Sequence, residues 1–323
     1  MDPVLSIRNL SLDFETPEGP VHALRKVNFD VPRNHIVGIV GESGSGKSTV
    51  ISAAMRLLAN NAVIRSGEVI FNGRDILGLS PQELRAQRGE QISMVFQDPM
   101  TSQIPVHTIG KQMMDIQYRR STTSRAEKRQ LAIDMLRRVG IPDPEERLTQ
   151  YPHQFSGGMR QRISIAMALL MNPQLLIADE PTTALDVTME AQIIHLLREL
   201  KEDFDGSILF VSHNLGLIAE LCDYVVVMYA GQVIEQGSVE DLFYRAGHPY
   251  TQALLECDPA RIDRVTPTLP TIAGDVPDLH IIPNGCVFAP RCSQVMDKCW
   301  TQDADFSAIS AQHTASCHLL SHA

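Results

Sequence analysis

The sequence is poor in aromatic residues, holds a single tryptophan and lacks any long apolar run. Aromatic side chains account for 5% of its 323 residues. No stretch approaches the ~20 consecutive apolar residues that a membrane-spanning helix needs. The first residues, Met-Asp-Pro-Val, also lack the charged and then apolar pattern of a secretory signal. We therefore expect a cytoplasmic chain that contacts a membrane only through partner proteins.

Basic residues are also in deficit, with 28 lysines and arginines against 38 acidic residues and a net charge of −10. Proteins that bind nucleic acid through its phosphates need an excess of positive charge, so we expect no nucleic-acid partner. The hydrophobic share of 44% and the charged share of 20% are ordinary for a soluble globular protein. The length suits one large domain with an appendage, or two domains.

The most informative stretch is residues 41–49, GESGSGKST, which fits the phosphate-binding pattern GxxxxGK[ST] in full. Residues 36–40 before it are typical of a buried strand, and residues 50–58 after it predict a helix. Glycines let the backbone wrap around phosphate oxygens, so that N–H groups and the helix N-terminus converge on negative charge. We expect Lys47 to contact the β- and γ-phosphates of a nucleoside triphosphate and Ser48 to bind Mg²⁺. The other nucleotide-binding residues of this loop are expected to be Gly41, Ser43, Gly44, Ser45, Gly46 and Thr49.

Residues 4–34 alternate polar and apolar side chains around a turn at residues 17–20, which predicts an antiparallel β subdomain. Phe14 lies just before that turn and would either stack on the nucleotide base or pack in the core. Residues 66–73 predict a further strand and turn. Residues 80–83, Ser-Pro-Gln-Glu, predict the capped start of a helix.

A helical subdomain is predicted from about residue 100 to residue 172, because strand signals stop after residues 92–96. A capping box at residues 124–127 starts a helix that ends at Gly140. The basic residues of this helix are interpreted as a solvated face rather than a binding patch. Its apolar face is expected to carry Leu131, Met135, Leu136 and Val139.

Two further apolar segments end on chemically functional residues. Residues 175–180 predict a strand that ends on two carboxylates, and residues 207–213 a strand that ends on a histidine, with a helix at residues 188–204 between them. This alternation predicts a mainly parallel sheet with helices on both faces, in which ligand-binding residues follow the carboxyl ends of strands. The residues in such positions are Gln97, Asp179, Glu180 and His213.

These four residues suit the hydrolysis of a nucleoside triphosphate. Asp179 is expected to bind Mg²⁺ together with Ser48, and Glu180 to orient or deprotonate the attacking water. Gln97 and His213 would hold or sense the γ-phosphate. Taken singly, Glu180 could be a surface acid, His213 a core histidine and Gln97 a loop residue. The presence of all four residues downstream of a phosphate loop favours a catalytic role for them.

Several motifs of this chain resemble those of ABC ATPases. Residues 155–162, FSGGMRQR, are similar to the signature motif of that family, with residues 163–171 as its helix. Residues 179–186, DEPTTALD, resemble its second nucleotide motif and D-loop. Residues 95–99 and 211–213 resemble its Q-loop and H-loop.

The resemblance covers residues 4–257 and implies a head-to-tail dimer of nucleotide-binding domains. Each ATP would lie between the phosphate loop of one subunit and the signature residues of the other. The dimer would close when ATP binds and open after hydrolysis. The implied signature contacts are Ser156, Gly157 and Gly158, and the implied Mg²⁺ ligands are Ser48, Gln97 and Asp179.

The C-terminal part of the chain resembles one particular subfamily of these ATPases. Residues 247–255 and 285–292 are similar to parts of the C-terminal extension of oligopeptide/dipeptide-type transporter ATPases. Six prolines within residues 258–290 predict an irregular surface segment. The expected fold class is therefore an α/β P-loop ABC ATPase core with an antiparallel β subdomain, an inserted helical subdomain and an irregular extension. We expect the nucleotide-binding domain at residues 1–257 and the extension at residues 258–323.

Four of the six cysteines lie in the extension, and a reducing cytoplasm disfavours disulfides, so the cluster favours a metal site. The spacings match neither zinc modules nor ferredoxin runs and do not choose the metal. The resemblance to the oligopeptide/dipeptide subfamily implies a [4Fe–4S] cluster, with zinc as the alternative. The expected ligands are Cys286, Cys292, Cys299 and Cys317.

The same resemblance implies the partners. They are two transmembrane permease subunits, a second and homologous ATPase in a heterodimer, and an external substrate-binding protein. The chain would then act peripherally at the cytoplasmic side of the inner membrane and energise import of dipeptides or oligopeptides. Gln103 and Ile104 replace the leucine and asparagine usual in this subfamily, beside the groove expected to receive a membrane subunit.

Other functions stay open at this point. Glutathione, nickel and oligosaccharides are alternative substrates within the subfamily. A non-transport ABC ATPase acting on DNA or ribosomes is disfavoured by the single cassette, the absence of extended heptads and the acidic balance. A regulatory protein that binds ATP without hydrolysis would need neither Glu180 nor His213, and a kinase would have no use for the signature motif.

Overall fold

The computed structural model describes residues 2–183, 185–258 and 270–322. The chain divides into two compact units, one made of residues 1–79 and 210–323 and the other of residues 80–209. The first unit holds the phosphate loop and the C-terminal extension. Strand β8 (Ser207–Val211) carries the chain from the second unit back to the first.

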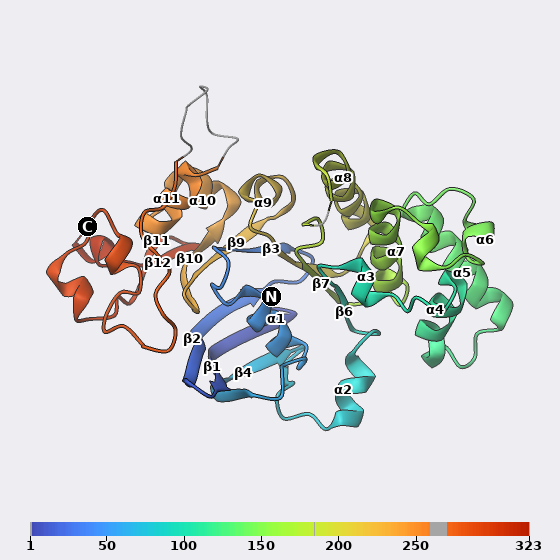
Figure 1. The fold of residues 1–323 in the computed structure, drawn as a ribbon, viewed down its shortest axis with the longest axis horizontal. Helices are drawn as coiled ribbons and strands as arrows, with labels where there is room; N and C mark the ends of the chain where they lie inside the picture. Colours follow the sequence, from blue (N-terminus) through green and yellow to red (C-terminus); the bar gives the residue numbers. More distant parts are fainter. Residues whose placement is uncertain (1, 184, 259–269, 323) are drawn as a thin grey trace. The chain divides into compact units, whose positions relative to one another are not determined.

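The first unit contains the predicted antiparallel subdomain as a four-stranded sheet in the order β2-β1-β4-β5 (Figure 1). The hairpin closes where Thr16 pairs with Gly19, at the turn that the sequence predicts. Most apolar side chains of the two hairpin strands are buried, whereas most of the polar side chains between them are at least partly exposed. The strands are β1 (Leu5–Thr16), β2 (Gly19–Val31), β4 (Ala62–Phe71) and β5 (Arg74–Asp75).

A second run of paired strands in this unit has the order β11-β12-β10-β9-β3. Strand β3 (Ile36–Val40) is buried along its whole length and runs parallel to β9 (Tyr224–Tyr229), as the continuous apolar segment predicts. Strand β9 forms a hairpin with β10 (Gln232–Ser238). The accompanying helices are α9 (Leu215–Leu221), α10 (Val239–Arg245) and α11 (Pro249–Glu256).

The extension, which is predicted to be irregular, contains two strands near its end. Strands β11 (Phe306–Ser310) and β12 (His313–Ser316) form a hairpin there, and β12 pairs with β10. Residues 270–288 are loops and turns, as expected, and 3-10 turns follow at Ala289–Arg291 and Asp297–Trp300. The rest of the proline-rich segment, residues 259–269, lies outside the described residues.

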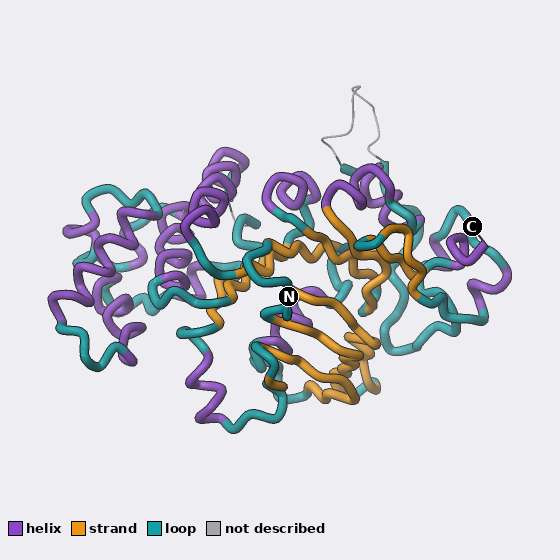
Figure 2. Tube along the Cα trace, turned by 180° about the vertical axis from the view of Figure 1, so that it is seen from behind, coloured by secondary structure: helices purple, strands orange, loops and turns teal. Residues whose placement is uncertain are grey.

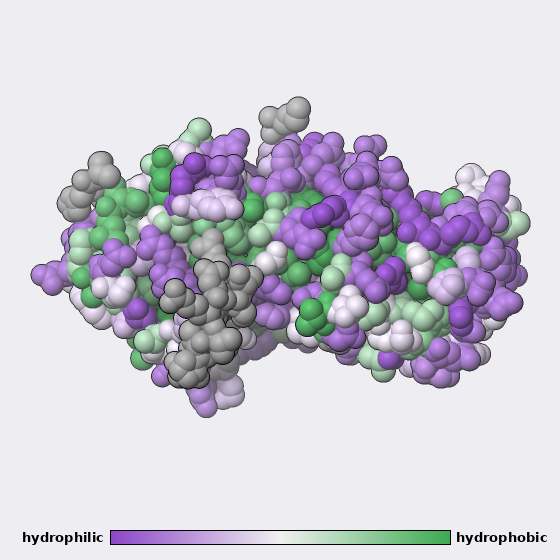
Figure 3. Space-filling view, turned by 90° about the horizontal axis from the view of Figure 1, so that it is seen from above, coloured by the Kyte–Doolittle hydropathy of each residue, from purple (hydrophilic) through white to green (hydrophobic). Residues whose placement is uncertain are grey.

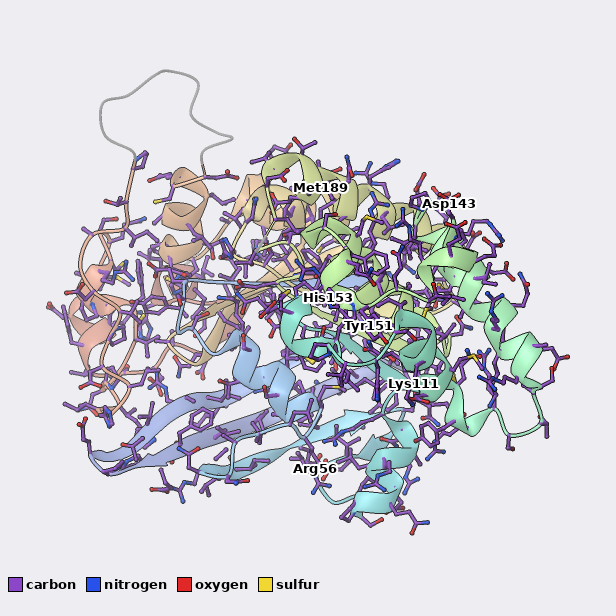
Figure 4. All side chains as sticks on the ribbon, turned by 45° about the vertical axis from the view of Figure 1, so that its right-hand side comes forward. Arg56, Lys111, Asp143, Tyr151, His153 and Met189 are labelled. Atoms are coloured by element: carbon purple, nitrogen blue, oxygen red, sulfur yellow. The ribbon has the colours of Figure 1, made fainter. Side chains whose placement is uncertain are left out.

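Helix α1 (Lys47–Ala54) follows the phosphate loop but ends four residues earlier than predicted. Arg56 adopts a φ of 48°, which a right-handed helix does not accommodate. Its guanidinium donates to the carbonyl of Leu79 at 2.5 Å, which fixes this turn (Arg56 is labelled in Figure 4). A tertiary contact therefore ends the helix.

The second unit begins with α2 (Pro81–Gln87), whose Ser80 cap forms the predicted capping box. Strands β6 (Ile92–Val95) and β7 (Leu175–Asp179) pair in parallel. Residues 96–174 between them hold only helices and loops, which confirms the predicted interruption of strand signals (Figure 2). The helices are α3 (Pro99–Ser102), α4 (Ile109–Ile116), α5 (Arg125–Arg138), α6 (Pro144–Arg147) and α7 (Gly157–Leu169), followed after β7 by α8 (Val187–Asp203).

The buried face of α5 agrees with the predicted one at Leu136 and Val139 but not at Leu131. Leu131 is 38% exposed, while Ala132, Leu136 and the cap residue Val139 are buried at the spacing of one helix face. The basic residues pair on the outside, for example Arg137 with Asp134 at 2.9 Å. Hydrophilic side chains cover most of this part of the surface in Figure 3, in agreement with a solvated helical face. None of the described helices is long and apolar enough to cross a membrane.

Candidate nucleotide site

The phosphate loop connects buried strand β3 to the first turn of α1. Gly44 and Gly46 adopt φ values of 79° and 99°, which glycine alone enters without steric cost. The Ser45 N–H donates to the carbonyl of Glu42 at 3.2 Å, and the Ser45 carbonyl accepts from the N–H of Gly231 at 3.0 Å. The loop therefore wraps tightly just ahead of a helix N-terminus, which is an arrangement suited to phosphate.

Lys47 lies inside this loop rather than in solvent. Its Nζ donates to the carbonyl of Gly41 at 2.7 Å and to that of Glu42 at 2.9 Å, and the side chain is buried. Two neutral carbonyl acceptors of the loop thus hold the ammonium. It can exchange these contacts for phosphate oxygens, which are stronger acceptors. Ser48 at the start of α1 is exposed, and Thr49 beside it is half-buried.

In the second unit the structure brings together two of the predicted catalytic residues. Glu180 follows the end of β7, next to Asp179, and its Oε2 accepts from Gln97 Nε2 at 3.2 Å and from Thr183 Oγ1 at 2.9 Å. Glu180 has a φ of 43°, which is rare for a residue with a side chain and is concentrated at functional sites. The backbone strain and the two donors fix the direction of this carboxylate.

The signature motif lies at the start of α7. Helix α7 begins at Gly157, six residues before the predicted helix, because Ser156 is its N-cap and accepts from the Met159 N–H at 3.4 Å. Ser156 and Gly157 are exposed, and Gly158 is buried. The serine hydroxyl and the first N–H groups of the helix therefore face solvent at one helix N-terminus.

The remaining predicted residues are in the first unit. His213 is exposed just after β8, and Phe14 is half-buried in β1, opposite Val21. The first unit thus contains the phosphate loop, Phe14 and His213. The second unit contains Gln97, Asp179, Glu180 and residues 156–158.

The four cysteines of the extension share one neighbourhood without forming a tight cluster. The Cys286 N–H donates to the carbonyl of Cys299 at 2.8 Å. The pKa of the Cys286 thiol is raised to about 11, chiefly by burial and to a lesser extent by the nearby thiols of Cys299, Cys317 and Cys292. Within the described residues, however, no three His, Cys, Asp or Glu side chains are close enough to hold a metal ion. The four thiols are therefore chemically suitable as metal ligands, but they are not placed close enough together to hold one metal ion.

Two side chains outside the sequence predictions contact the phosphate loop. The Tyr250 hydroxyl accepts from the N–H of Glu42, and Arg291 pairs with the Glu42 carboxylate. Gln103, one of the two residues that depart from the subfamily pattern, is buried and donates to the carbonyl of Arg160 and to Ser164 Oγ on α7. The sequence contains no local signal for these long-range contacts.

Comparison with known proteins identifies two matching families and several similar proteins. Residues 24–183 match the family described as ABC transporter, and residues 234–299 match the one described as oligopeptide/dipeptide transporter, C-terminal region. The chain is 48% identical to a probable peptide ABC transporter ATP-binding protein of Sinorhizobium fredii, over 98% of this chain and 95% of that protein. It is 49% identical to the oligopeptide transport ATP-binding protein OppD of Escherichia coli, over 92% of this chain and 88% of that protein.

The dipeptide transport ATP-binding protein DppD of Bacillus subtilis is 47% identical, over 99% of this chain and 95% of that protein. Among solved structures, the dimeric ATP-binding cassette MJ0796 bound to ADP and Pi is similar with a TM-score of 0.64 and 28% identity. That match covers 73% of this chain and 98% of the cassette. It confirms the predicted ABC ATPase fold class.

Proposed function

This chain belongs to the ATP-binding proteins of ABC transporters of the oligopeptide/dipeptide type, and on that premise we propose that it energises the import of peptides. It is an ABC ATPase and the ATP-hydrolysing subunit of a transporter, and its family implies ATP and Mg²⁺ as ligands. The observation that carries the peptide assignment is the match of residues 234–299 to the C-terminal region of oligopeptide/dipeptide transporters. The names of the relatives that match along nearly the whole chain support it.

We assign the site residues the roles that their chemistry supports. Lys47 would bind the β- and γ-phosphates, and Ser48, Asp179 and Gln97 would bind Mg²⁺. Glu180 would act on the attacking water, a role that suits its fixed direction beside Gln97. His213 would contact the γ-phosphate, and Phe14 would stack on the base.

The signature residues would complete the site of a second ATPase subunit. Exposure of Ser156 and Gly157 at the N-terminus of α7 supports this role, because a phosphate from another subunit could reach their hydroxyl and N–H groups. The partner would be a homologous ATPase in a heterodimer. Two permease subunits and an external binding protein would complete a transporter in which this chain acts at the cytoplasmic face of the inner membrane.

The extension would hold a [4Fe–4S] cluster through Cys286, Cys292, Cys299 and Cys317. Four thiols from one segment support an iron–sulfur cluster, whose iron atoms are bridged by sulfide so that the thiolates stand further apart than around one ion. The loose grouping of the cysteines disfavours zinc, which needs four ligands at about 2.3 Å from one centre. The cluster would anchor the extension. Iron, sulfide and zinc analysis of anaerobically purified protein tests this, and stoichiometric zinc without iron would contradict it.

Purification of the assembled complex tests the transport function. The chain would be tagged, extracted from its native membranes in mild detergent and analysed by mass spectrometry beside an untagged control. We expect two multi-span membrane proteins and a second ATPase. After reconstitution with its binding protein, ATP hydrolysis should be stimulated by peptides more strongly than by glutathione, nickel or oligosaccharides. Recovery of the chain alone, or with ribosomes or DNA, would contradict the proposal and favour a non-transport ATPase.

A further inference from the structure

One side chain of the C-terminal extension, Arg291, reaches the phosphate loop. Its Nη1 donates to Glu42 Oε2 at 2.7 Å and its Nη2 to Glu42 Oε1 at 3.1 Å, across 249 residues of sequence. Only 3% of the arginine side chain is exposed, against 28% of the glutamate. This is a bidentate, charge-assisted pair whose cation is removed from solvent.

The other donors of Arg291 hold the guanidinium in place. Its Nε donates to the carbonyl of Ala273 at 2.9 Å and its Nη2 to that of Ile272 at 3.0 Å. Its Nη1 also donates to the hydroxyl of Tyr229 at 3.2 Å. A planar guanidinium can serve all of these acceptors at once, which a lysine ammonium cannot. Arg291 is therefore oriented toward Glu42 by the extension itself.

Glu42 is fixed at three points. Its carboxylate pairs with Arg291, its N–H donates to the Tyr250 hydroxyl at 2.9 Å, and its carbonyl accepts from Lys47 Nζ at 2.9 Å. Tyr250 is fully buried and packs against Tyr229 with the ring centroids 4.6 Å apart. One loop residue thus links the phosphate-binding lysine to the extension.

The charge of Glu42 calls for such a partner. It is the one acidic residue of the sequence GESGSGKST, in a loop suited to a polyanion. An uncompensated carboxylate there would repel the phosphates of a nucleotide, and more strongly where solvent is excluded. The Arg291 guanidinium neutralises it and at the same time holds the adjoining backbone.

We propose that Arg291 is a positioning residue of the nucleotide site, which neutralises Glu42 and keeps the phosphate loop able to accept MgATP. The inference rests on the proposed ATP site and gives the C-terminal extension a part in nucleotide binding. It does not depend on a metal at the cysteines.

Calorimetric titration of MgATP into the full-length chain tests this inference. Arg291→Ala should weaken binding about tenfold, as expected if the fraction of chains with a competent loop falls to about a tenth. Adding Glu42→Gln to this variant should restore most of the affinity, because the uncompensated charge is gone. Its thermal stability should stay as low as that of Arg291→Ala, because the contact with the extension is still missing.

The matched control is Arg245→Ala, which removes an exposed arginine paired with Asp241 on α10 and should bind MgATP like the wild type. If Arg291→Ala does not fold, Arg291→Gln keeps donors for the neighbouring carbonyls and should show the same loss and rescue. Unchanged affinity, or a loss that Glu42→Gln does not rescue, would mean that Arg291 only anchors the extension and would overturn the inference. Failure of the wild type to bind MgATP would instead overturn the proposed function.

Discussion

The phosphate loop of the first unit and the signature motif of the second are held in place by different means. Tyr250 and Arg291 contact the loop residue Glu42 from 208 and 249 residues away. Ser156 of the signature accepts a local hydrogen bond, from the Met159 N–H three residues on. Distant parts of the chain thus brace the loop, whereas the signature is formed locally and exposed. Bracing suits a site that must bind ligand by itself, and exposure suits a surface that a second subunit must reach.

This contrast predicts that changes at the phosphate loop alter nucleotide binding and that changes at Glu180 or at the signature motif alter turnover. The largest expected effect is that of Glu180→Gln. It should lower the hydrolysis rate of the assembled transporter by about 10²–10⁴-fold, the range for loss of a general base. MgATP affinity should stay close to that of the wild type. Steady-state hydrolysis and equilibrium binding measure both, and unchanged hydrolysis would refute Glu180 as the base.

The glycines of the two motifs should differ in their tolerance of a methyl group. A Cβ on Gly41, at a φ of 151°, would lie 2.1 Å from the backbone oxygen of Met228, whereas one on Gly158 would meet the flexible end of Met189 on α8 (labelled in Figure 4). Gly41→Ala should cost about 3 kcal/mol of unfolding free energy, as severe overpacking does. Gly158→Ala should cost less than about 1 kcal/mol, because the methionine can move and alanine favours a helix. Denaturant unfolding of the two variants side by side checks this, and equal losses would break the contrast.

Removal of the loop ammonium should act on binding. Lys47→Ala should raise the Kd for MgATP about 30-fold, which corresponds to the loss of charge-assisted hydrogen bonds worth about 2 kcal/mol. Arg138→Ala on α5 is the control, since it removes an exposed cation of the second unit whose carboxylate partner, Asp203, is also exposed. Unaltered affinity of Lys47→Ala would count against the phosphate-binding loop.

The smallest expected effect concerns pH. His248 caps α11 by accepting from the Tyr250 N–H at 3.0 Å, and burial lowers the pKa of its imidazole to about 3. As the pH falls, the unfolded chain therefore binds a proton at this histidine before the folded chain does. The stabilisation that this group contributes is present above its pKa in the unfolded chain, about 6.5, and is lost as the pH falls toward its pKa in the folded chain. Between pH 6.5 and pH 5.5, the unfolding free energy of the wild type should fall by about 1 kcal/mol more than that of His248→Asn, whose asparagine keeps the helix cap but does not titrate.

Thermal unfolding at the two pH values measures this difference. The matched control is His153→Asn, because His153 is exposed beside Tyr151 near the signature (both labelled in Figure 4). It should leave the pH dependence unchanged. Equal acid sensitivity of the wild type and His248→Asn would contradict the account of this buried cap.

Features that depend on residues close together in the sequence could be predicted from it. The capping boxes at Ser80 and Ser124 and the buried strand before the phosphate loop depend on residues within a few positions, and the structure contains them. The predicted end of α1 at residue 58 was wrong, because the helix ends at Ala54 and Arg56 turns away to donate to the carbonyl of Leu79. On α5, Leu136 and Val139 are buried as predicted, but Ala132 is buried in place of Leu131, because packing and not periodicity alone selects the buried face.

Long-range contacts account for what the sequence does not predict. Strand β11 is mostly exposed and has no apolar alternation, and it forms because β12 pairs with the edge of β10. The pair between Glu42 and Arg291 joins residues from opposite ends of the chain. The catalytic motifs could be found as local patterns, but the contacts that hold the phosphate loop could not.

The most direct test of the division between the two units is a titration of MgATP into the dilute, isolated chain carrying Ser156→Ala. Ser124→Ala, which removes a similar cap from α5, is its matched control. The account predicts that both variants bind MgATP like the wild type, while Ser156→Ala alone slows hydrolysis once the transporter is assembled. A loss of affinity in isolated Ser156→Ala as large as that of Lys47→Ala would contradict the account, because the signature would then serve the phosphate loop of its own chain.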